Sequence, residues 1–379
     1  MILNRLRIAD FRNHSRTEIE CPDGTLLLLG ENGAGKTTIL EAVSLLCTSR
    51  SFVTKHDRSL IATDAVGGFV AEGEFTASTR TLKHVHIEYS REQQKKKIEV
   101  DYAPLDSVSD LIGMLPLVAL SPQHRPITAG GPAERRSFID FVISQVHHSY
   151  LEDLLLYRRA LRQRNTLLAD AEGRLSAIAG TIDAWDHSLA ESGVRILRKR
   201  AEFIAQFVPY FQRSMRGVIG EREIVDMSYK GSLRMNPAED DAIERYAAEL
   251  REQRPTDLRR GTTTIGPHRD DLNIMLNDLD VRAQASQGQH KTVLISLKLA
   301  EYHYLDEHLD ERPILLLDDV FSELDDIRLT RVLEHASGLG QTFITSANMN
   351  MLRAFEFAGS MHHALRIDQG AVCTLADVA

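Results

Sequence analysis

The sequence is poor in cysteine and contains no long apolar run. Its 379 residues include only three cysteines, far apart in the chain, and this sparse use is typical of a reducing compartment rather than of a disulfide scaffold. No segment approaches the roughly eighteen apolar residues needed to span a bilayer. The first residues lack the basic and apolar regions of a signal peptide. We therefore expect a cytoplasmic protein that has no membrane partner.

Positive charge is not in excess either. The chain carries 45 Lys and Arg against 54 Asp and Glu, a net charge of −9, which argues weakly against a non-specific nucleic-acid binder. Residues 301–379 hold 14 acidic and 5 basic residues, so the first 300 residues hold 40 of each sign. Because salt screens exposed charges beyond about 8 Å, a local basic face can still act. Composition permits DNA binding without predicting it.

One stretch predicts a phosphate site. The apolar run Leu26–Leu29 is typical of a strand, the next residues spell G-x-x-x-x-G-K-T, and helical spacing follows. In this order, glycines let the backbone approach a phosphate chain, and amide N–H groups at the helix start attract it. Lys36 would reach the β- and γ-phosphates, and the Thr37 hydroxyl would bind Mg²⁺. We expect a nucleoside triphosphate held by Gly30, Glu31, Asn32, Gly33, Ala34, Gly35, Lys36, Thr37 and Thr38.

A second apolar strand ends in two carboxylates. The run Pro313–Leu317 predicts a buried strand, and Asp318 and Asp319 follow it. A carboxylate at such a strand end is the expected Mg²⁺ partner of a phosphate loop. We expect Asp318 to hold the metal and Asp319 to orient or deprotonate the attacking water. Asp319 and Lys36 are therefore candidate catalytic residues.

The pattern of strands and helices divides the chain into three segments. Alternating apolar residues predict strands in the first third, whereas helical spacing dominates from Pro132 to about Arg254. We expect an α/β fold, a P-loop ATPase head with a mixed sheet and an inserted, mainly α-helical arm. Residues 1–125 and 256–379 would form the two lobes of the head, and residues 126–255 the arm. Within the arm, a helix over 181–208 should end before Pro209.

The order of these elements resembles the heads of ABC-type ATPases. A Ser-x-Gly-Gln element at Ser286–Gln289 lies upstream of the second carboxylate strand, and Phe321–Asp325 follows that strand. In that family the element caps the γ-phosphate of ATP bound to a second copy. The resemblance therefore implies two ATP molecules between two heads, with Ser286, Gly288 and Gln289 acting in trans and hydrolysis releasing the dimer. It also implies that Gln123 senses the nucleotide, beside the metal and the attacking water.

Further segments narrow the resemblance within that superfamily. They are Leu6–Asn13, Gly30–Thr37, Ser121-Pro122, Arg135–Asp140, Tyr157 with Gln163–Asn165, Gly266–Leu272, Ser286–Gln289 and Leu317–Asp325. In these segments the sequence resembles the RecF family of bacterial recombination mediators. That resemblance implies ATP-dependent binding of DNA near junctions of duplex and single strand, and cooperation with RecO and RecR in loading RecA. It also implies slow hydrolysis, because Ser346-Ala347-Asn348 stands where transporter heads carry a histidine.

Basic residues on two parts of the chain are the candidate DNA contacts. The sequence has no interleaving of aromatic and basic residues of the kind that stacks single strands, which favours contact with the duplex backbone. For each basic cluster the alternative of a solvated helix or strand face stays open. The candidates are Arg5 and Arg7 in the head and Arg158, Arg159, Arg162, Arg195, Arg198 and Lys199 in the arm.

Two other classes of protein contain a phosphate loop of this kind. The nucleotide-binding subunit of an ABC transporter has the same head chemistry, but the helical insertion argues against it. A metabolic kinase uses the same loop, but it does not need the Ser-x-Gly-Gln element. One further segment, His268-Arg269-Asp270, could form a metal pair, lie near a dimer interface or make structural hydrogen bonds, and the sequence does not choose among these.

Overall fold

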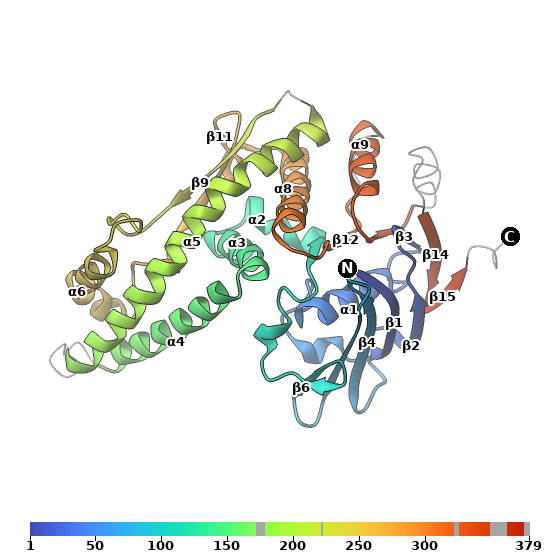
Figure 1. Ribbon diagram of the computed structural model, residues 1–379, viewed down its shortest axis with the longest axis horizontal. Coiled ribbons are helices and arrows are strands. Elements are labelled where there is room, and N and C mark those ends of the chain that lie inside the picture. Colours follow the sequence, from blue (N-terminus) through green and yellow to red (C-terminus); the bar gives the residue numbers. More distant parts are fainter. Residues whose placement is uncertain (172–178, 221–222, 322–325, 349–361, 375–379) are drawn as a thin grey trace. The chain divides into compact units, whose positions relative to one another are not determined.

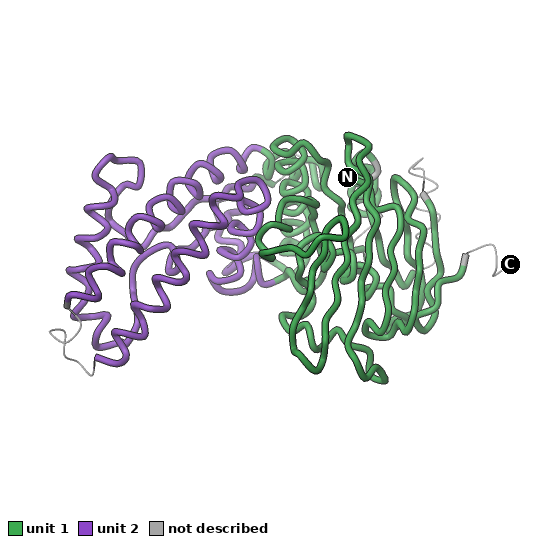
Figure 2. Tube along the Cα trace, turned by 60° about the horizontal axis from the view of Figure 1, so that its bottom comes forward, with its two compact units in different colours: residues 1–125, 210–224, 286–379 green, residues 126–209, 225–285 purple. Residues whose placement is uncertain are grey.

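The chain folds into two compact units (Figures 1 and 2). The computed structural model describes all residues except 172–178, 221–222, 322–325, 349–361 and 375–379. The head unit comprises residues 1–125, 210–224 and 286–379, and the arm unit comprises residues 126–209 and 225–285. The arm thus ends at 285 and not near 255 as expected. The reason is a sheet that helical periodicity could not reveal, in which β10 (Asp271–Leu276) pairs with β9 (Val225–Lys230) and β11 (Leu279–Asp280).

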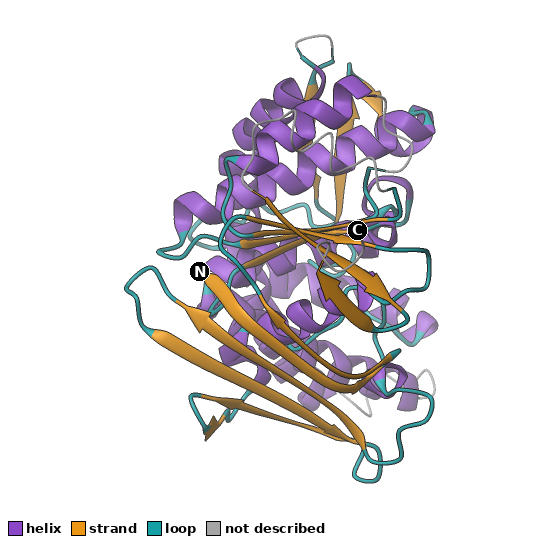
Figure 3. Cartoon of the chain, turned by 90° about the vertical axis from the view of Figure 1, so that its right-hand side faces the viewer, coloured by secondary structure: helices purple, strands orange, loops and turns teal. Residues whose placement is uncertain are grey.

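The first sheet of the head unit is antiparallel (Figure 3). Its strands have the predicted alternation of apolar residues. Buried and part-exposed residues alternate strictly along β4, as expected for a sheet with one face on the core. The strand order is β2-β1-β4-β5-β6-β7. The strands are β1 (Ile2–Phe11), β2 (His14–Glu20), β4 (Gly68–Thr76), β5 (Leu82–Ser90), β6 (Lys95–Val100) and β7 (Ala103–Pro104).

The second sheet of the head unit is parallel except for its last strand, and it positions the site. Its order is β15-β14-β3-β13-β12-β8. All residues of β3, β12 and β13 are buried, because both faces of a parallel sheet are covered. Parallel strands bring their carboxyl ends to one edge, which is where ligands of open α/β sheets bind. The strands are β3 (Thr25–Leu29), β8 (Leu117–Leu120), β12 (Ile314–Asp318), β13 (Thr342–Ser346), β14 (His362–Asp368) and β15 (Ala371–Thr374).

The helices of the head unit include two that begin at predicted motifs. Helix α1 (Lys36–Thr48) follows the phosphate loop, and α8 (Gln287–His308) follows Ser286. Ser286 caps α8, since its Oγ accepts a hydrogen bond from the Gln289 amide at 3.2 Å, in a reciprocal capping box. The remaining helices are η1 (Asp57–Leu60), η2 (Val108–Leu111), η3 (Pro122–His124) and α9 (Asp326–Ser337).

The arm unit is mainly helical, as predicted, and a buried ion network connects three of its helices. Arg164 is fully buried and donates to Asp186 at 2.5 Å and to Asp257 at 2.7 Å. Removing one member of such a network would strand a buried charge, which costs about 3–5 kcal/mol. The helices are α2 (Pro126–Ala129), α3 (Pro132–Val146), α4 (His148–Asp170), α5 (Ala179–Ile219), α6 (Ala242–Arg260) and α7 (Val281–Gln284).

The expected helix end before Pro209 is wrong. Helix α5 continues through Pro209 to Ile219, 41 residues or roughly 60 Å at 1.5 Å per residue. Proline costs a helix one backbone hydrogen bond, but it does not remove the apolar stripe that drives burial. That stripe continues past the proline with Phe211 and Met215, both fully buried.

Candidate functional site

The predicted phosphate loop lies between β3 and α1, and its glycines are needed for geometric reasons. Gly35 precedes the first helical residue with φ +114°, and a Cβ there would lie 2.5 Å from His14 Nε2. At Gly30, a Cβ would collide with the backbone carbonyl oxygen of Ile367. The first turn of α1 leaves backbone N–H groups without helical acceptors, so the loop and helix start can bind an anion.

Asn13 in the β1–β2 turn and His14 at the start of β2 make hydrogen bonds to this loop. Asn13 Nδ2 donates to the Gly33 carbonyl at 3.2 Å, and Asn13 Oδ1 accepts from the Thr38 hydroxyl at 3.0 Å. His14 is completely buried, and its Nε2 lies 3.1 Å from the Gly35 carbonyl. Burial lowers the pKa of His14. Sequence reasoning placed Asn13 only in a resembling segment and did not single out His14, because no local pattern links residues 13–14 to residues 33–38.

Lys36 is the first residue of α1, and its side chain contacts the loop. Its side chain is buried, and its Nζ donates to the carbonyls of Gly30 and Glu31, both at 2.8 Å. Burial lowers the pKa of Lys36, and the negative charges of Asp319 and Asp318 oppose that shift. The ammonium group is therefore placed between loop carbonyls and the carboxylates at the end of β12.

The carboxylates at the end of β12 meet the start of α1. The Thr37 hydroxyl donates to Asp318 Oδ1 at 2.7 Å, and the Thr345 hydroxyl donates to the same oxygen at 2.8 Å. Burial raises the pKa of Asp318, with a further contribution from Asp319, while these two hydroxyls oppose it. The Asp319 amide donates to Thr345 Oγ1 at 2.9 Å, and Asp319 has φ +48°. Tertiary structure thus brings residues 37, 318, 319 and 345 together.

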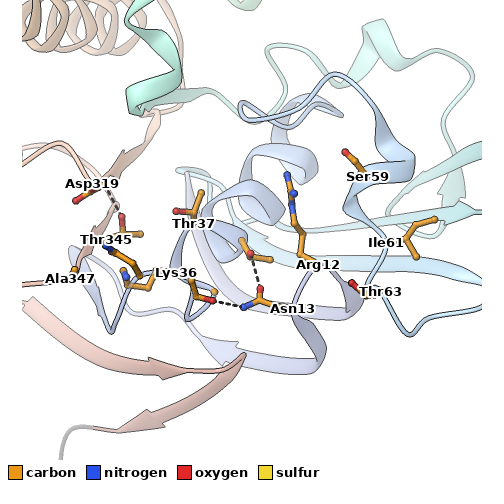
Figure 4. A pocket seen from close by; sticks show the side chains of 14 residues that line it. Arg12, Asn13, Lys36, Thr37, Ser59, Ile61, Thr63, Asp319, Thr345 and Ala347 are labelled. Carbon is orange, nitrogen blue, oxygen red and sulfur yellow. Dashed lines mark hydrogen bonds between the residues drawn. The ribbon is translucent and has the colours of Figure 1, made fainter.

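A cavity of about 430 Å³ opens beside these residues (Figure 4). Its size lies within the range usual for small-molecule sites. Beyond the loop it extends to residues 59–63, which had no signal in the sequence. Arg12 also lines it, with Nη2 2.8 Å from Oε1 of the buried Glu41. The full lining is Arg12, Asn13, Asn32, Gly33, Gly35, Lys36, Thr37, Thr38, Ser59, Ile61, Thr63, Asp319, Thr345 and Ala347.

Eight of the predicted nucleotide-site residues are not part of this lining: Gly30, Glu31, Ala34, Gln123, Ser286, Gly288, Gln289 and Asp318. Gln123 is exposed in η3, where its backbone N–H donates to Ser121 Oγ at 3.3 Å. Ser286 and Gly288 are exposed at the start of α8. The Gln289 side chain donates to Glu223 at 2.8 Å. Residues 322–325, which follow the carboxylates, lie outside the described residues.

The predicted DNA contacts have very different surroundings. Arg5 and Arg7 lie among four carboxylates, those of Glu18, Glu20, Glu72 and Glu74. In the arm, some of the candidates have partners: Arg195 with Asp153 at 2.7 Å, Arg198 with backbone carbonyls of Pro237 and Glu239, and Lys199 with Glu202 at 2.9 Å.

Three candidate contacts on α4 are less engaged. The side chains of Arg159 and Arg162 are exposed and form no hydrogen bond or ion pair within the described part of the chain. Arg158 is half exposed and lies 3.8 Å from Asp140 Oδ2. These three side chains have the fewest competing partners among the predicted DNA contacts.

The His268–Asp270 segment makes structural hydrogen bonds within the arm unit. His268 Nε2 is 3.1 Å from the Thr263 carbonyl, which can only accept, so Nδ1 accepts the Tyr157 hydroxyl proton at 2.7 Å. Asp270 accepts from the Tyr229 hydroxyl at 2.6 Å. Among the described residues, no cluster of three or more His, Cys, Asp or Glu side chains could hold a metal ion.

The fold and the site together define a class. A phosphate loop after β3, and a carboxylate pair after β12 with β13 between the two strands, are the parts of a P-loop nucleotide-binding head. Residues 2–366 match the family model described as the RecF/RecN/SMC N terminal domain. An Smc head domain from Pyrococcus furiosus has the same fold, with a TM-score of 0.56 at 13% identity over 100% of this chain and 97% of that one.

Full-length relatives then specify the family. The chain is 40% identical to the DNA replication and repair protein RecF of Chloroherpeton thalassium, over 91% of this chain and 95% of the relative. It is 36% identical to that of Salinibacter ruber, over 98% and 91% of the two chains. A structure of the recombination mediator protein RecF-ATPrS in the RecFOR pathway matches with a TM-score of 0.88 at 30% identity, covering 98% of each chain. This chain belongs to the RecF family.

These similarities settle two of the expectations. The predicted head fold and the predicted family are confirmed. The alternative of a transporter subunit finds no support in them. Within the described part of the chain, no helix combines the length and the apolar character that crossing a membrane requires.

Proposed function

We propose that this chain is a cytoplasmic DNA repair protein whose dimerisation on DNA is timed by ATP. The observation that carries the proposal is the hydrogen bond between Thr37 and Asp318, 2.7 Å long, which joins the phosphate loop to the carboxylate strand across 281 residues of sequence. A relative is named as RecF with bound ATP in the RecFOR pathway, which supports ATP as the nucleotide. Relatives named DNA replication and repair proteins support DNA as the target.

The residues at this point fit a magnesium nucleotide. Thr37 Oγ1 and Asp318 Oδ1 are oxygen ligands of the kind Mg²⁺ prefers, and burial leaves the Asp318 carboxylate in need of a compensating positive charge. Bound Mg²⁺ would neutralise phosphate charge. Lys36 would exchange its two bonds to loop carbonyls for bonds to phosphate oxygens, and the loop amides would hold the phosphate chain. The cavity extends to Ser59, Ile61 and Thr63, and we propose that the base would lie in that part of it.

Asp319 is the candidate base. It lines the cavity beside Lys36, and the hydrogen bond from its amide to Thr345 holds its backbone in place. A carboxylate there can orient a water molecule and accept its proton during attack on the γ-phosphate. We propose weak, DNA-stimulated hydrolysis that acts as a switch, with Gln123 contributing only in the assembled dimer, since it lies outside the cavity of one chain.

Ser286, Gly288 and Gln289 would complete the site of a second copy. The Ser286 hydroxyl accepts from Gln289 and still has its proton to donate, and it lies exposed at the N-terminus of the 22-residue helix α8. Such a helix start attracts phosphate. ATP would therefore be part of the dimer interface.

The DNA contacts we propose are in the arm, with RecR, RecO and RecA as downstream partners. Arg159 and Arg162 are the best candidates, because among the described residues neither has a partner to release. Arg5 and Arg7 are the weakest, because four glutamates already neutralise them. Each phosphate neutralised should lower the slope of log affinity against log salt by about 0.9.

Sedimentation velocity with gapped duplex DNA tests this proposal. We expect a monomer with ADP and a dimer with ATP. Ser286→Arg should block the dimer while leaving nucleotide binding to the monomer, because the added side chain occupies the capping position. Thr79→Arg, at an exposed turn of the head unit, is the matched control and should dimerise normally. A protein that stays monomeric with ATP and DNA, yet hydrolyses ATP at its full rate, contradicts the proposal.

A further inference from the structure

A second cavity lies within the arm unit, remote in sequence from the phosphate loop. Its volume is about 190 Å³, and three of the segments that carry the family resemblance but take no part in nucleotide binding meet in it. We call it the arm cavity; its polar lining residues are Arg136, Ser137, Asp140, Tyr157, Arg158, Arg200 and His268. Leu154, Leu161 and Ile196 contribute apolar wall.

The arm cavity has more positive than negative charge. Three guanidinium groups line it against the single carboxylate of Asp140. His268 adds no charge at neutral pH, because burial lowers its pKa to about 4 and both ring nitrogens are hydrogen-bonded. Burial lowers the pKa of Arg136 and the positive charge of Arg200 adds to the shift, whereas the carboxylates of Asp140, Asp271 and Asp270 oppose it. The lining therefore carries a surplus of about two positive charges that an anion would relieve.

Not all of these guanidinium groups are engaged. Arg200 is buried and fixed: its nitrogens donate to Asp140, Tyr150 and Tyr229, and to the Pro267 carbonyl at 2.8 Å. Arg136 uses one nitrogen, which donates to the Asp270 carbonyl at 2.6 Å. Arg158 makes no hydrogen bond within the described residues and only approaches Asp140, at 3.8 Å. Arg136 and Arg158 thus keep donors for a ligand.

We propose that the arm cavity binds a phosphomonoester, with Arg136 and Arg158 donating to its oxygens beside the fixed charge of Arg200. A phosphomonoester carries close to two negative charges at neutral pH, which matches the surplus, whereas an internal DNA phosphate carries one. Guanidinium groups bind phosphate oxygens in pairs. The cavity is too small for a base pair but suits one phosphoryl group, and its apolar wall would contact the attached sugar.

The phosphomonoester could be the phosphorylated end of a DNA strand or a free nucleotide. If it is a DNA end, the inference rests on the proposed function, and the arm would distinguish a phosphorylated strand end at a gap from an unphosphorylated one. To test this, full-length protein is titrated against recessed duplexes whose terminus carries a phosphate, at the 5′ or at the 3′ end, or a hydroxyl. Fluorescence anisotropy reports the affinity.

We expect one phosphorylated probe to bind about tenfold more tightly than its hydroxyl counterpart, a difference of about 1.4 kcal/mol. Arg158→Gln should reduce that ratio to twofold or less. Arg251→Gln changes an exposed arginine of α6 that does not line the cavity, and it should keep the ratio. If the two variants have the same affinity ratio, the cavity does not bind the terminal phosphate and the inference is wrong.

In the second part of the test, free AMP and inorganic phosphate are titrated calorimetrically into the Lys36→Ala variant, in which binding at the phosphate loop is weakened. Binding that Arg158→Gln weakens at least fivefold, without a preference among DNA ends, supports the inference with a free nucleotide as the source. Absence of both the end preference and this binding overturns it. A wild-type protein that binds no DNA probe contradicts the proposed function, and the AMP titration then decides about the cavity by itself.

Discussion

Replacing Asn13 tests whether the β1–β2 turn is part of the nucleotide site. Asn13→Ala removes two hydrogen bonds, one to the Gly33 carbonyl and one from the Thr38 hydroxyl. Both connect the turn to the loop that would hold the phosphates. Without these hydrogen bonds the loop has more conformations available. The entropy lost when the nucleotide orders the loop then reduces the free energy of nucleotide binding.

The structure sets the size of this effect. A neutral side-chain hydrogen bond contributes about 0.5–1.5 kcal/mol. The bond to Gly33 is exposed and 3.2 Å long, so it belongs at the low end, whereas the bond from Thr38 is half-buried and 3.0 Å long. Together we expect about 1–2 kcal/mol, a five- to thirtyfold weaker binding of ATP. Thr38→Val removes one bond only and should weaken binding about two- to tenfold.

Titration of a fluorescent ATP analogue into the monomer measures this, with the double variant completing a cycle. The two changes should be less than additive, because each removes the same Asn13–Thr38 bond. Asn4→Ala is the control: it removes a side-chain hydrogen bond of β1, to Thr76 at 2.6 Å, away from the loop. An Asn13→Ala protein that binds within twofold of wild type, or an Asn4→Ala protein equally impaired, would refute the reasoning.

Three further predictions follow from single residues. Lys36→Ala removes a charged hydrogen-bond donor and should weaken ATP binding by about 1.5–3 kcal/mol, measured by the same titration; unchanged affinity would exclude Lys36 as a phosphate ligand. Gly35→Ala introduces a Cβ 2.5 Å from His14 Nε2 at φ +114°, and a thermal melt should show a loss of about 1–3 kcal/mol, whereas an unchanged melting temperature would mean the loop has room. The pKa of His268 is lowered to about 4, so the unfolded chain binds more protons below pH 6.5, and stability falls as pH drops from about 6.5 to about 4, by up to about 3 kcal/mol. The free energy of unfolding in urea, measured between pH 6.5 and pH 4, should fall less steeply with pH in His268→Gln than in wild type. His187→Gln, which changes an exposed histidine, should keep the wild-type slope. Equal slopes in the two variants would contradict the role given to His268.

The structural features that depend on residues adjacent in sequence were predictable. The loop Gly30–Thr38 and the apolar strand before Asp318 are each specified by neighbours in the chain, since backbone conformation and strand burial depend on local residue types. The helical character of the arm followed from spacing in the same way. The exact extent of the arm could not be predicted in this way. The pairing of β9 with β10 joins residues 225–230 to 271–276, and no local sequence pattern predicts that pairing.

The sequence by itself determined that this protein has a phosphate loop, a carboxylate strand and a helical insertion. Only the tertiary structure decided which side chains face each other: Asn13 and His14 against the loop, Thr37 against Asp318, and Arg136, Arg158 and Arg200 around one cavity. It also decided that Arg5 and Arg7 are neutralised by glutamates of neighbouring strands. The physical reason is that charge balance and burial depend on partners that are distant along the chain and become neighbours only after folding.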